Sequence, residues 1–322
     1  MAFETGTASD AADFFSKLKT FLTTNSDLVA AGQAWTQVWT SSGDVVLKGT
    51  GLSGTDTILV GMRLINDPTH SDFRLMINGM TGVLTGATAI EGHVNSGALV
   101  GMYLDDNPMT YWFVASGRRF VAVAQVSTVF EALYGGFILP YATPSEYSTP
   151  LFVGGSRGAG IRATSSWRST DDEHTHFPYP TRITLSTPIV SDSGALLLDP
   201  GGVWQSGVNR NNPPPTYFYV GPNAFGDGFG TKAGFDIEQQ QGYDELRWLT
   251  RQCFGGDYVL TPLTLTQQVP ADETFGVLDG CYEVSGYENS STNIITVGST
   301  DHLVIQNVFR TGIGDFWALA LG

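Results

Sequence analysis

The chain has 322 residues, a formal net charge of −15 at pH 7 and a pI near 4.5. This acidic balance argues against a role on nucleic acid, where a basic face is expected. Only 15% of the residues are charged, against about 25% in an average soluble domain, and the 39 glycines exceed the usual share of roughly 7%. The composition therefore favours a β-rich protein with many turns and much of its surface covered by partners.

The N-terminal segment 1–27 is predicted to be helical over about residues 8–24. Its apolar residues recur at i, i+4, i+7 and i+8, at Phe14, Leu18, Phe21 and Leu22. Ser9 is placed as the N-cap, and acidic residues occupy the first turn. Residues 1–24 lack the basic start and apolar core of a signal peptide. We expect one amphipathic helix that covers one patch of a β-rich core.

Residues 28–139 are predicted to form a β-rich domain of antiparallel hairpins, because no segment between the apolar runs is long enough for a crossover helix. Its most apolar part, residues 111–142, is interrupted by the polar turn 116–119, so it does not fit a membrane span. Instead, residues 111–115 and 120–126 predict a β-hairpin. The second strand has no polar alternation before Gln125, so we expect both of its faces to be covered.

A short helix is predicted over 128–134, with Ser127 or Thr128 as its cap and Gly135-Gly136 at its end. In that helix Glu131 would either face solvent or pair with one of the two neighbouring arginines, Arg118 or Arg119.

Residues 140–222 are rich in proline and glycine and are predicted to be a loop-rich docking region. Proline lowers the entropy cost of ordering a loop, and aromatic side chains supply contact area with few rotatable bonds. We therefore select as candidate partner-binding residues the aromatics around the stretch "NRNN", namely Trp204, Tyr217, Tyr219 and Phe225.

Residues 223–322 are predicted to be a C-terminal β-rich region that either stands alone or completes the domain of 28–139. One helix is expected over 244–253, and strands are expected from 259 to the end of the chain. Cys253 and Cys281 lie 28 residues apart without a CxxC pattern, so we interpret both as reduced core residues.

The best candidate metal ligands are His174 and His176, which lie on one face of an extended strand, next to the acidic residues 171–173. The simpler interpretation is a solvated acidic loop with hydrogen-bonded histidines and no cofactor. A catalytic zinc site needs a third protein ligand, which the sequence does not identify. If three chains met on an axis, the three His-x-His pairs would supply six imidazoles to one metal ion.

Catalytic patterns are weak elsewhere, and we predict that the protein is not an enzyme. The glycine run 154–160 lacks the following helix and the GK[ST] sequence of a phosphate loop. The pair Asp105-Asp106 precedes Asn-Pro in a turn signature, and no GxSxG nucleophile elbow is present. The sequence does not exclude a pair of carboxylates for glycoside hydrolysis, because that chemistry depends on the distance between the two carboxylates across the glycosidic bond.

Several long strings resemble a family of virion structural proteins of tailed bacteriophages. They are the opening "MAFETGTASDAADFFSKLKTFLTTNSDLVAAGQAWTQVW", the block "YWFVASGRRFVAVAQVSTVFEALYGGFILPYATPSEYSTPLFVGGS", "HTHF", and the terminal "NIITVGSTDHLVIQNVFRTGIGDFWALAL". The resemblance runs from end to end and implies a tail, tail-tip or baseplate component without catalytic residues. Tailed phages bind metal through His-x-His pairs on threefold axes, which His174 and His176 resemble.

The residues and the resemblance together predict a mainly β protein with antiparallel, sandwich-like sheets, an N-terminal helix and one or two short helices. The leading hypothesis is a non-enzymatic building block of a phage tail or baseplate, assembled in the host cytoplasm, whose partners are its own copies and other virion proteins. One alternative is a receptor- or glycan-binding module at the tail periphery, for which Trp204, Tyr217, Tyr219 and Phe225 would form an exposed platform. Another is a head or neck decoration protein.

Overall fold

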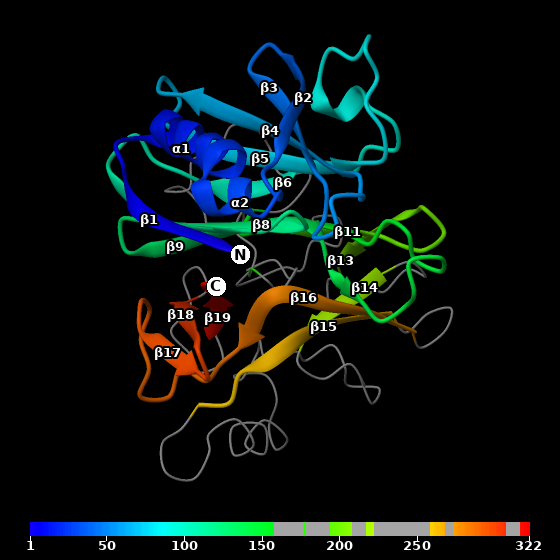
Figure 1. The fold of residues 1–322 in the computed structure, drawn as a ribbon. Helices are drawn as coiled ribbons and strands as arrows, with labels where there is room; N and C mark the ends of the chain where they lie inside the picture. Colours follow the sequence, from blue (N-terminus) through cyan, green and yellow to red (C-terminus); the bar gives the residue numbers. More distant parts are fainter. Residues whose placement is uncertain (158–176, 178–193, 208–216, 222–257, 268–272, 307–315) are drawn as a thin grey trace.

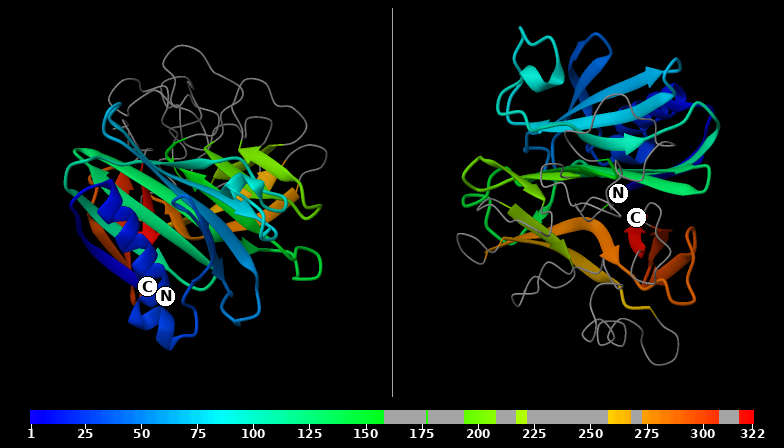
Figure 2. Two further views of the ribbon diagram at one scale, coloured as in Figure 1. Left: turned by 90° about the horizontal axis from the view of Figure 1, so that it is seen from above. Right: turned by 180° about the vertical axis from the view of Figure 1, so that it is seen from behind.

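A computed structural model describes residues 1–157, 177, 194–207, 217–221, 258–267, 273–306 and 316–322. These residues are mainly β, in three stacked layers of largely antiparallel strands with one long helix, which confirms the predicted fold class (Figure 1). The two chain ends lie side by side at one edge of the stack, as both further views show (Figure 2).

The upper layer is a five-stranded antiparallel sheet whose strands follow one another in chain order. They are β2 (Thr36–Ser41), β3 (Asp44–Gly49), β4 (Ile58–Asp67), β5 (Asp72–Met80) and β6 (Val100–Tyr103). Short turns join the first four strands, whereas the connection from β5 to β6 is a long loop that contains one 3-10 turn, η1 (Ile90–Gly92).

The central and lower layers belong to one 14-stranded sheet that folds back on itself. The central layer contains β1 (Ala2–Ala8), β7 (Met109–Ala115), β8 (Arg119–Val126), β9 (Val129–Phe137), β11 (Leu151–Gly155), β12 (Ala195–Leu198) and β13 (Trp204–Gly207), in this order. The lower layer contains β14 (Tyr217–Gly221), β15 (Thr261–Gln267), β16 (Glu273–Glu283), β19 (Phe316–Ala320), β18 (Thr300–Gln306) and β17 (Ile294–Val297), with β10 (Leu139–Pro140) paired to β16. The one parallel pairing among the described strands, β13 with β14, links the two layers.

The predicted N-terminal helix is confirmed as α1 (Ala11–Thr24), which a short second helix, α2 (Ser26–Ala30), follows. Its N-cap is Asp10 rather than Ser9, because the Asp10 carboxylate accepts the backbone N–H of Asp13 at 2.8 Å. The predicted apolar stripe is buried, and the Phe14 ring meets Phe113 of β7 edge to face at 5.1 Å. The helix thus covers the end of the core between the upper and central layers.

The hairpin predicted over 111–126 is confirmed as β7 and β8, and it forms the middle of the molecule. Along β8, Phe120, Ala122 and Ala124 face the core shared with the upper layer. Val121 and Val123 face the core shared with the lower layer. The prediction that both faces of this strand are covered is therefore correct, and the apolar run is explained by packing inside the chain.

The short helix predicted over 128–134 is wrong, because these residues belong to strand β9. Ser127, one of the two predicted helix caps, has a positive φ of 57° and lies in the tight turn between β8 and β9. The eight-pair ladder from Arg119–Gly136 to Val126–Val129 satisfies the backbone in place of helical hydrogen bonds. Tertiary pairing has overridden the local capping signal.

Strands also account for much of the remaining chain that the structure describes. The region 140–222 contributes β11, β12, β13 and β14, and the predicted C-terminal strands are confirmed as β15, β17, β18 and β19. The helix predicted over 244–253 lies outside the described residues, and the proposed domain boundaries stay a prediction. No described helix is both long and apolar enough to cross a membrane.

A buried arginine lies between the central and lower layers. Arg119 of β8 is fully buried, and its Nε lies 3.5 Å from the Oδ2 of Asp279 in β16. Its Nη2 lies 3.1 Å from the sulfur of Met1, while Nε and Nη1 have no hydrogen-bond partner among the described residues. A Cβ at Gly280 would approach Nη2 to 2.2 Å, so glycine is needed beside the guanidinium.

Candidate interaction surface

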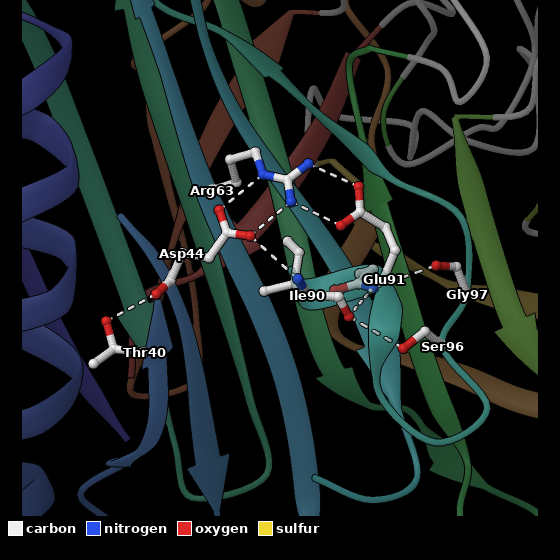
Figure 3. Close-up of polar contacts among 8 residues, drawn as sticks. Thr40, Asp44, Arg63, Ile90, Glu91, Ser96 and Gly97 are labelled. Carbon is white, nitrogen blue, oxygen red and sulfur yellow. Dashed lines mark hydrogen bonds and ion pairs between the residues drawn. The ribbon is translucent and has the colours of Figure 1, made fainter. Parts of the chain in front are cut away.

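The clearest polar network of the upper layer fixes the long loop between β5 and β6 to the sheet (Figure 3). Arg63 of β4 forms two hydrogen bonds to Asp44, at 2.8 and 2.6 Å, and two to Glu91 of η1, both at 2.7 Å. Paired N–H donors on a carboxylate are both strong and directional. These hydrogen bonds raise the pKa of Arg63 further above its ordinary value.

The same network holds the backbone of η1 against the sheet. The N–H of Ile90 donates to Asp44 Oδ2 at 3.1 Å. The carbonyl of Ile90 accepts from the Asn78 amide at 3.1 Å. It also accepts from the Ser96 hydroxyl at 3.2 Å (Figure 3). The base of the loop is therefore fixed at both its carboxylate and its backbone.

Residues 81–97 are further closed on themselves by backbone hydrogen bonds. Thr81 N donates to Val94 O and Val94 N donates to Gly82 O, both at 3.0 Å. A side chain adds to this closure, because the Leu84 N–H donates to Nδ1 of His93 at 3.1 Å. The His93 ring meets the Trp39 ring edge to face, with 4.6 Å between the ring centroids. Burial lowers the pKa of His93, so the imidazole is the neutral form that this acceptor role requires.

Trp204, a predicted partner-binding residue, joins this loop from β13. Its Nε1 donates to the Asn95 carbonyl at 2.8 Å, and the Asn95 amide donates to Gly202 O at 2.9 Å. Its ring packs closely on the loop and on β5, since a Cβ at Gly79 would lie 2.5 Å from Cη2 and one at Gly97 would lie 3.1 Å from Cδ2. Trp204 is therefore a half-buried anchor and not the freely exposed platform that the glycan hypothesis needs.

The outer end of this loop and its neighbour from 199–204 expose apolar side chains, which together we call the tip surface. It consists of Val83, Leu84, Val94 and Val203, whose exposed fractions are 36%, 46%, 43% and 56%. Glu91, the only acidic side chain in residues 81–97, is bound by Arg63, and His93 of the same loop is neutral. The one acidic side chain of the 199–204 segment, Asp199, accepts from Val203 N at 2.9 Å and from Gln205 Nε2 at 2.6 Å. A rigid, apolar and charge-poor surface can bind an apolar partner at low ordering cost.

The other predicted site residues are not brought to this surface by the described part of the chain. The backbones of Tyr217 and Tyr219 lie in β14, where Tyr219 pairs with Thr266 of β15. Phe225 and the metal candidates His174 and His176 lie outside the described residues. Within the described ranges no group of three His, Cys, Asp or Glu residues could hold a metal ion.

The candidate acids are occupied by structural contacts. Glu131 is buried in β9, where its Oε2 accepts the N–H of Tyr103 at 3.3 Å and the hydroxyl of Ser156. It neither faces solvent nor pairs with Arg118 or Arg119, because its strand directs it toward the edge of β6. Asp105 is also buried, and its Oδ1 accepts from Asp106 N and Asn107 Nδ2, as the turn signature predicts.

Cys281 is a free, buried thiol, as predicted for a reduced core residue. Burial raises the pKa of Cys281 to about 12, so the reactive thiolate is disfavoured at neutral pH. Its predicted counterpart Cys253 lies outside the described residues.

Sequence reasoning did not find the Arg63 network, because Asp44, Arg63 and Glu91 are separated by 19 and 28 residues and follow no spacing rule. The exposed valines gave no signal either, since isolated apolar residues are common on surfaces. No family model and no curated protein matches the chain.

Proposed function

We propose that this protein is a non-enzymatic structural component of a tailed-phage virion, in the tail or baseplate, that acts by binding its own copies and neighbouring virion proteins. The observation that carries the proposal is the tip surface, where a tightly hydrogen-bonded loop presents Val83, Leu84, Val94 and Val203 to solvent. The end-to-end resemblance of the sequence to virion proteins supplies the biological setting.

The physical argument concerns the cost of ordering. A loop that is already fixed by Arg63, Asn78 and Trp204 loses little conformational entropy when a partner covers it. The apolar area that is then buried contributes about 25 cal/mol per Å² with little to offset it. A loop built in this way suits a permanent contact between proteins better than it suits a catalytic lid, which has to move.

The acidic residues support the same proposal. Glu131 and Asp105 are buried and bound to backbone or hydroxyl groups, so neither carboxylate is placed to meet a substrate. The receptor- or glycan-binding alternative loses one of its four aromatics, because the Trp204 indole N–H is already bonded to Asn95.

The proposal is tested by complementation. A phage that lacks the gene is grown on cells supplying the chain, and purified particles are analysed by quantitative mass spectrometry and immunogold labelling. We expect the chain in particles at a fixed copy number, with label on the tail. Recovery of the chain only in the soluble lysate, with normal particles lacking it, would overturn the proposal.

A matched pair of variants tests the tip surface itself. Leu84→Asp places a charge on the tip surface, and Leu52→Asp makes the same change at an exposed leucine in the turn between β3 and β4. Both should fold, because both leucines are about half exposed. We expect Leu84→Asp to lower incorporation into particles about tenfold or more, which corresponds to about 1.4 kcal/mol, and Leu52→Asp to leave it unchanged. Normal incorporation of both variants with reduced host adsorption would favour the receptor-binding alternative.

A further inference from the structure

The sheet edges of this molecule differ in how they are protected. An unpaired edge strand presents free N–H and C=O groups and can pair with another chain, so most proteins block it with charge, proline, a bulge or a covering group. Among the described strands the upper sheet ends in β2 and β6, and the long sheet ends in β1 and β17.

Three of these edges carry such a feature. The register of β2 shifts between Gln37 and Trp39, as in a β-bulge. At β6, the N–H of Tyr103 donates to Glu131 and Gly101 pairs with Arg157. At β1, Lys17 Nζ donates to the Thr7 carbonyl at 3.0 Å.

Strand β17 carries none of them within its four residues. The one irregularity lies just before it, where Thr292 N donates to Val304 O and Val304 N donates to Asn293 O, both at 2.8 Å. Its sequence Ile-Ile-Thr-Val has no charge and no proline, and its ladder to β18 is continuous over all four residues. The exposed fractions of Ile294 and Val297 are 49% and 51%, and β18 is the one described strand that pairs with it. It lies at the outer end of the lower layer (Figure 1).

The register shows which backbone groups of β17 are directed outward. Val304 N donates to Asn293 O at 2.8 Å, and Val297 pairs with Thr300 across the turn at Gly298. Because hydrogen-bonded pairs alternate along an antiparallel ladder, Asn293, Ile295 and Val297 bond toward β18. The N–H and C=O groups of Ile294 and Thr296 therefore point away from β18, toward the open edge.

We propose that β17 pairs antiparallel with β17 of a second copy of this chain, about a twofold axis at Ile295. Ile294 then exchanges backbone hydrogen bonds with the partner's Thr296, and Thr296 does so with the partner's Ile294. The two Ile295 residues face each other as a close, non-hydrogen-bonded pair. The lower layers of the two copies become one continuous sheet, through an isologous interface.

Charge is the reason to choose a second copy as the occupant. Each chain carries a net charge of −15, so two copies repel each other and can meet closely only where charges are few. Strand β17 has none, and the antiparallel register places no charged residue opposite another within the four-residue strand. The carboxylate nearest to the strand, Asp301 of β18, already accepts the Thr296 hydroxyl at 2.6 Å. The four residues themselves offer a basic peptide no carboxylate, whereas a copy of the uncharged strand matches them.

This inference rests on the proposed function, since it names a surface through which copies meet, but its test uses purified protein. Sedimentation equilibrium should give a dimer of the 34.6 kDa chain, in equilibrium with monomer. Hydrogen exchange should show Ile294 and Thr296 amides that are protected at high protein concentration and exposed on dilution. If the chain is still monomeric at a protein concentration of about 100 μM, roughly 100 times a micromolar dissociation constant, the pairing is wrong.

Two variants separate this edge from other surfaces. Thr296→Pro removes an outward N–H and leaves the ladder to β18 intact, because that N–H does not bond to β18. Ile294→Lys puts a charge on the half-exposed face of each strand. We expect each to weaken dimerisation about tenfold or more. The matched control is Val38→Lys on the bulged edge β2, which should dimerise like the wild type.

The outcomes are distinguishable. If Thr296→Pro and Ile294→Lys dimerise as the wild type does while remaining folded, the β17 pairing is wrong. If the wild type is monomeric in solution yet enters particles, the pairing is wrong and the proposed function stands. If the wild type dimerises through β17 but is absent from particles, the pairing stands and the proposed function is wrong.

Discussion

Arg63 and Arg119 hold different parts of the molecule, and they are satisfied to very different degrees. Arg63 is partly exposed and meets two carboxylates through four hydrogen bonds of 2.6–2.8 Å. Arg119 is fully buried and has one carboxylate, Asp279, at 3.5 Å from its Nε. The more deeply buried charge thus has the poorer set of partners.

The difference indicates two kinds of role. The Arg63 network fixes the position of one loop, and water can solvate its members if a hydrogen bond breaks. Arg119 lies between two packed layers, where desolvation of a charge costs several kcal/mol and Coulomb attraction offsets it only with good geometry. Arg63 should therefore matter for the order of the tip surface, and the Arg119 pair for the stability of the whole fold.

The largest effect is expected for Asp279→Asn. This change removes the one described carboxylate beside Arg119 and leaves a buried guanidinium without a counter-charge. We expect the free energy of unfolding to fall by about 3 kcal/mol, the lower end for broken buried pairs, because Asp279 itself is a quarter exposed. Urea denaturation followed by circular dichroism measures the change.

The control is Arg119→Met, which removes the buried charge and keeps much of the side-chain volume. Since Nε and Nη1 have no hydrogen-bond partner among the described residues, this variant should lose less than about 1.5 kcal/mol. A greater loss for Arg119→Met than for Asp279→Asn would show that the guanidinium contributes more through its contacts than its burial costs.

A smaller and more local effect is expected for Arg63→Met. It leaves Asp44 in a largely buried position with only the Ile90 N–H and loses both hydrogen bonds to Glu91. We expect a loss of about 1–2 kcal/mol, because water can reach part of the site. Amide exchange should accelerate over 81–97 while β7 and β8 stay protected.

Glu91→Gln is the matched variant for that experiment. Glu91 is the more exposed of the two carboxylates, and an amide keeps one acceptor for Arg63, so the loss should be below about 1 kcal/mol. Equal acceleration of exchange in the upper and lower layers of the Arg63→Met protein would contradict a local role for this network.

Much of this architecture could be predicted from local patterns, and the two ion-pair sites could not. The 3.6-residue period of α1 and the apolar strings of β7 and β8 are local signals, so both were predicted correctly. Residues 128–134 carried a local capping signal that a ladder to β8 overrode. Trp204 was identified by its residue type, but its role as an anchor depends on glycines at 79 and 97, far away in sequence.

The ion pairs are set by sheet topology alone. Arg63 reaches Asp44 because β3 and β4 pair in one register, and Glu91 because a loop returns over them. Arg119 meets Asp279 only because the long sheet folds back and places β16 beneath β8. No spacing along the chain encodes such a return, so neither pair can be derived from the sequence by itself.

The smallest expected effect is a pH dependence of the tip surface through His93. Burial lowers the pKa of His93 below its ordinary value near 6.5, so protonation favours the state in which the loop is open. The contribution of His93 to loop stability is then fully present above pH about 6.5 and decreases as the pH falls below that value. A protonated Nδ1 also could not accept the Leu84 N–H, and the imidazolium would lose hydration against the edge of Trp39. Among the other charged groups near the loop, Asp44 and Glu91 are both bound to Arg63, and Asp199 accepts from Val203 N and Gln205 Nε2.

Amide exchange of residues 81–97, corrected for the intrinsic pH dependence of exchange, should therefore show more frequent opening at pH about 5 than at pH about 8. His93→Gln keeps an acceptor for the Leu84 N–H and removes the titration, so its opening should not change over this range. The matched control is His70→Gln, since His70 is exposed and bonds to Asp67 in the turn between β4 and β5, away from the tip surface. A pH response that persists in His93→Gln and vanishes in His70→Gln would assign the effect to the turn, and the tip surface would then be insensitive to pH.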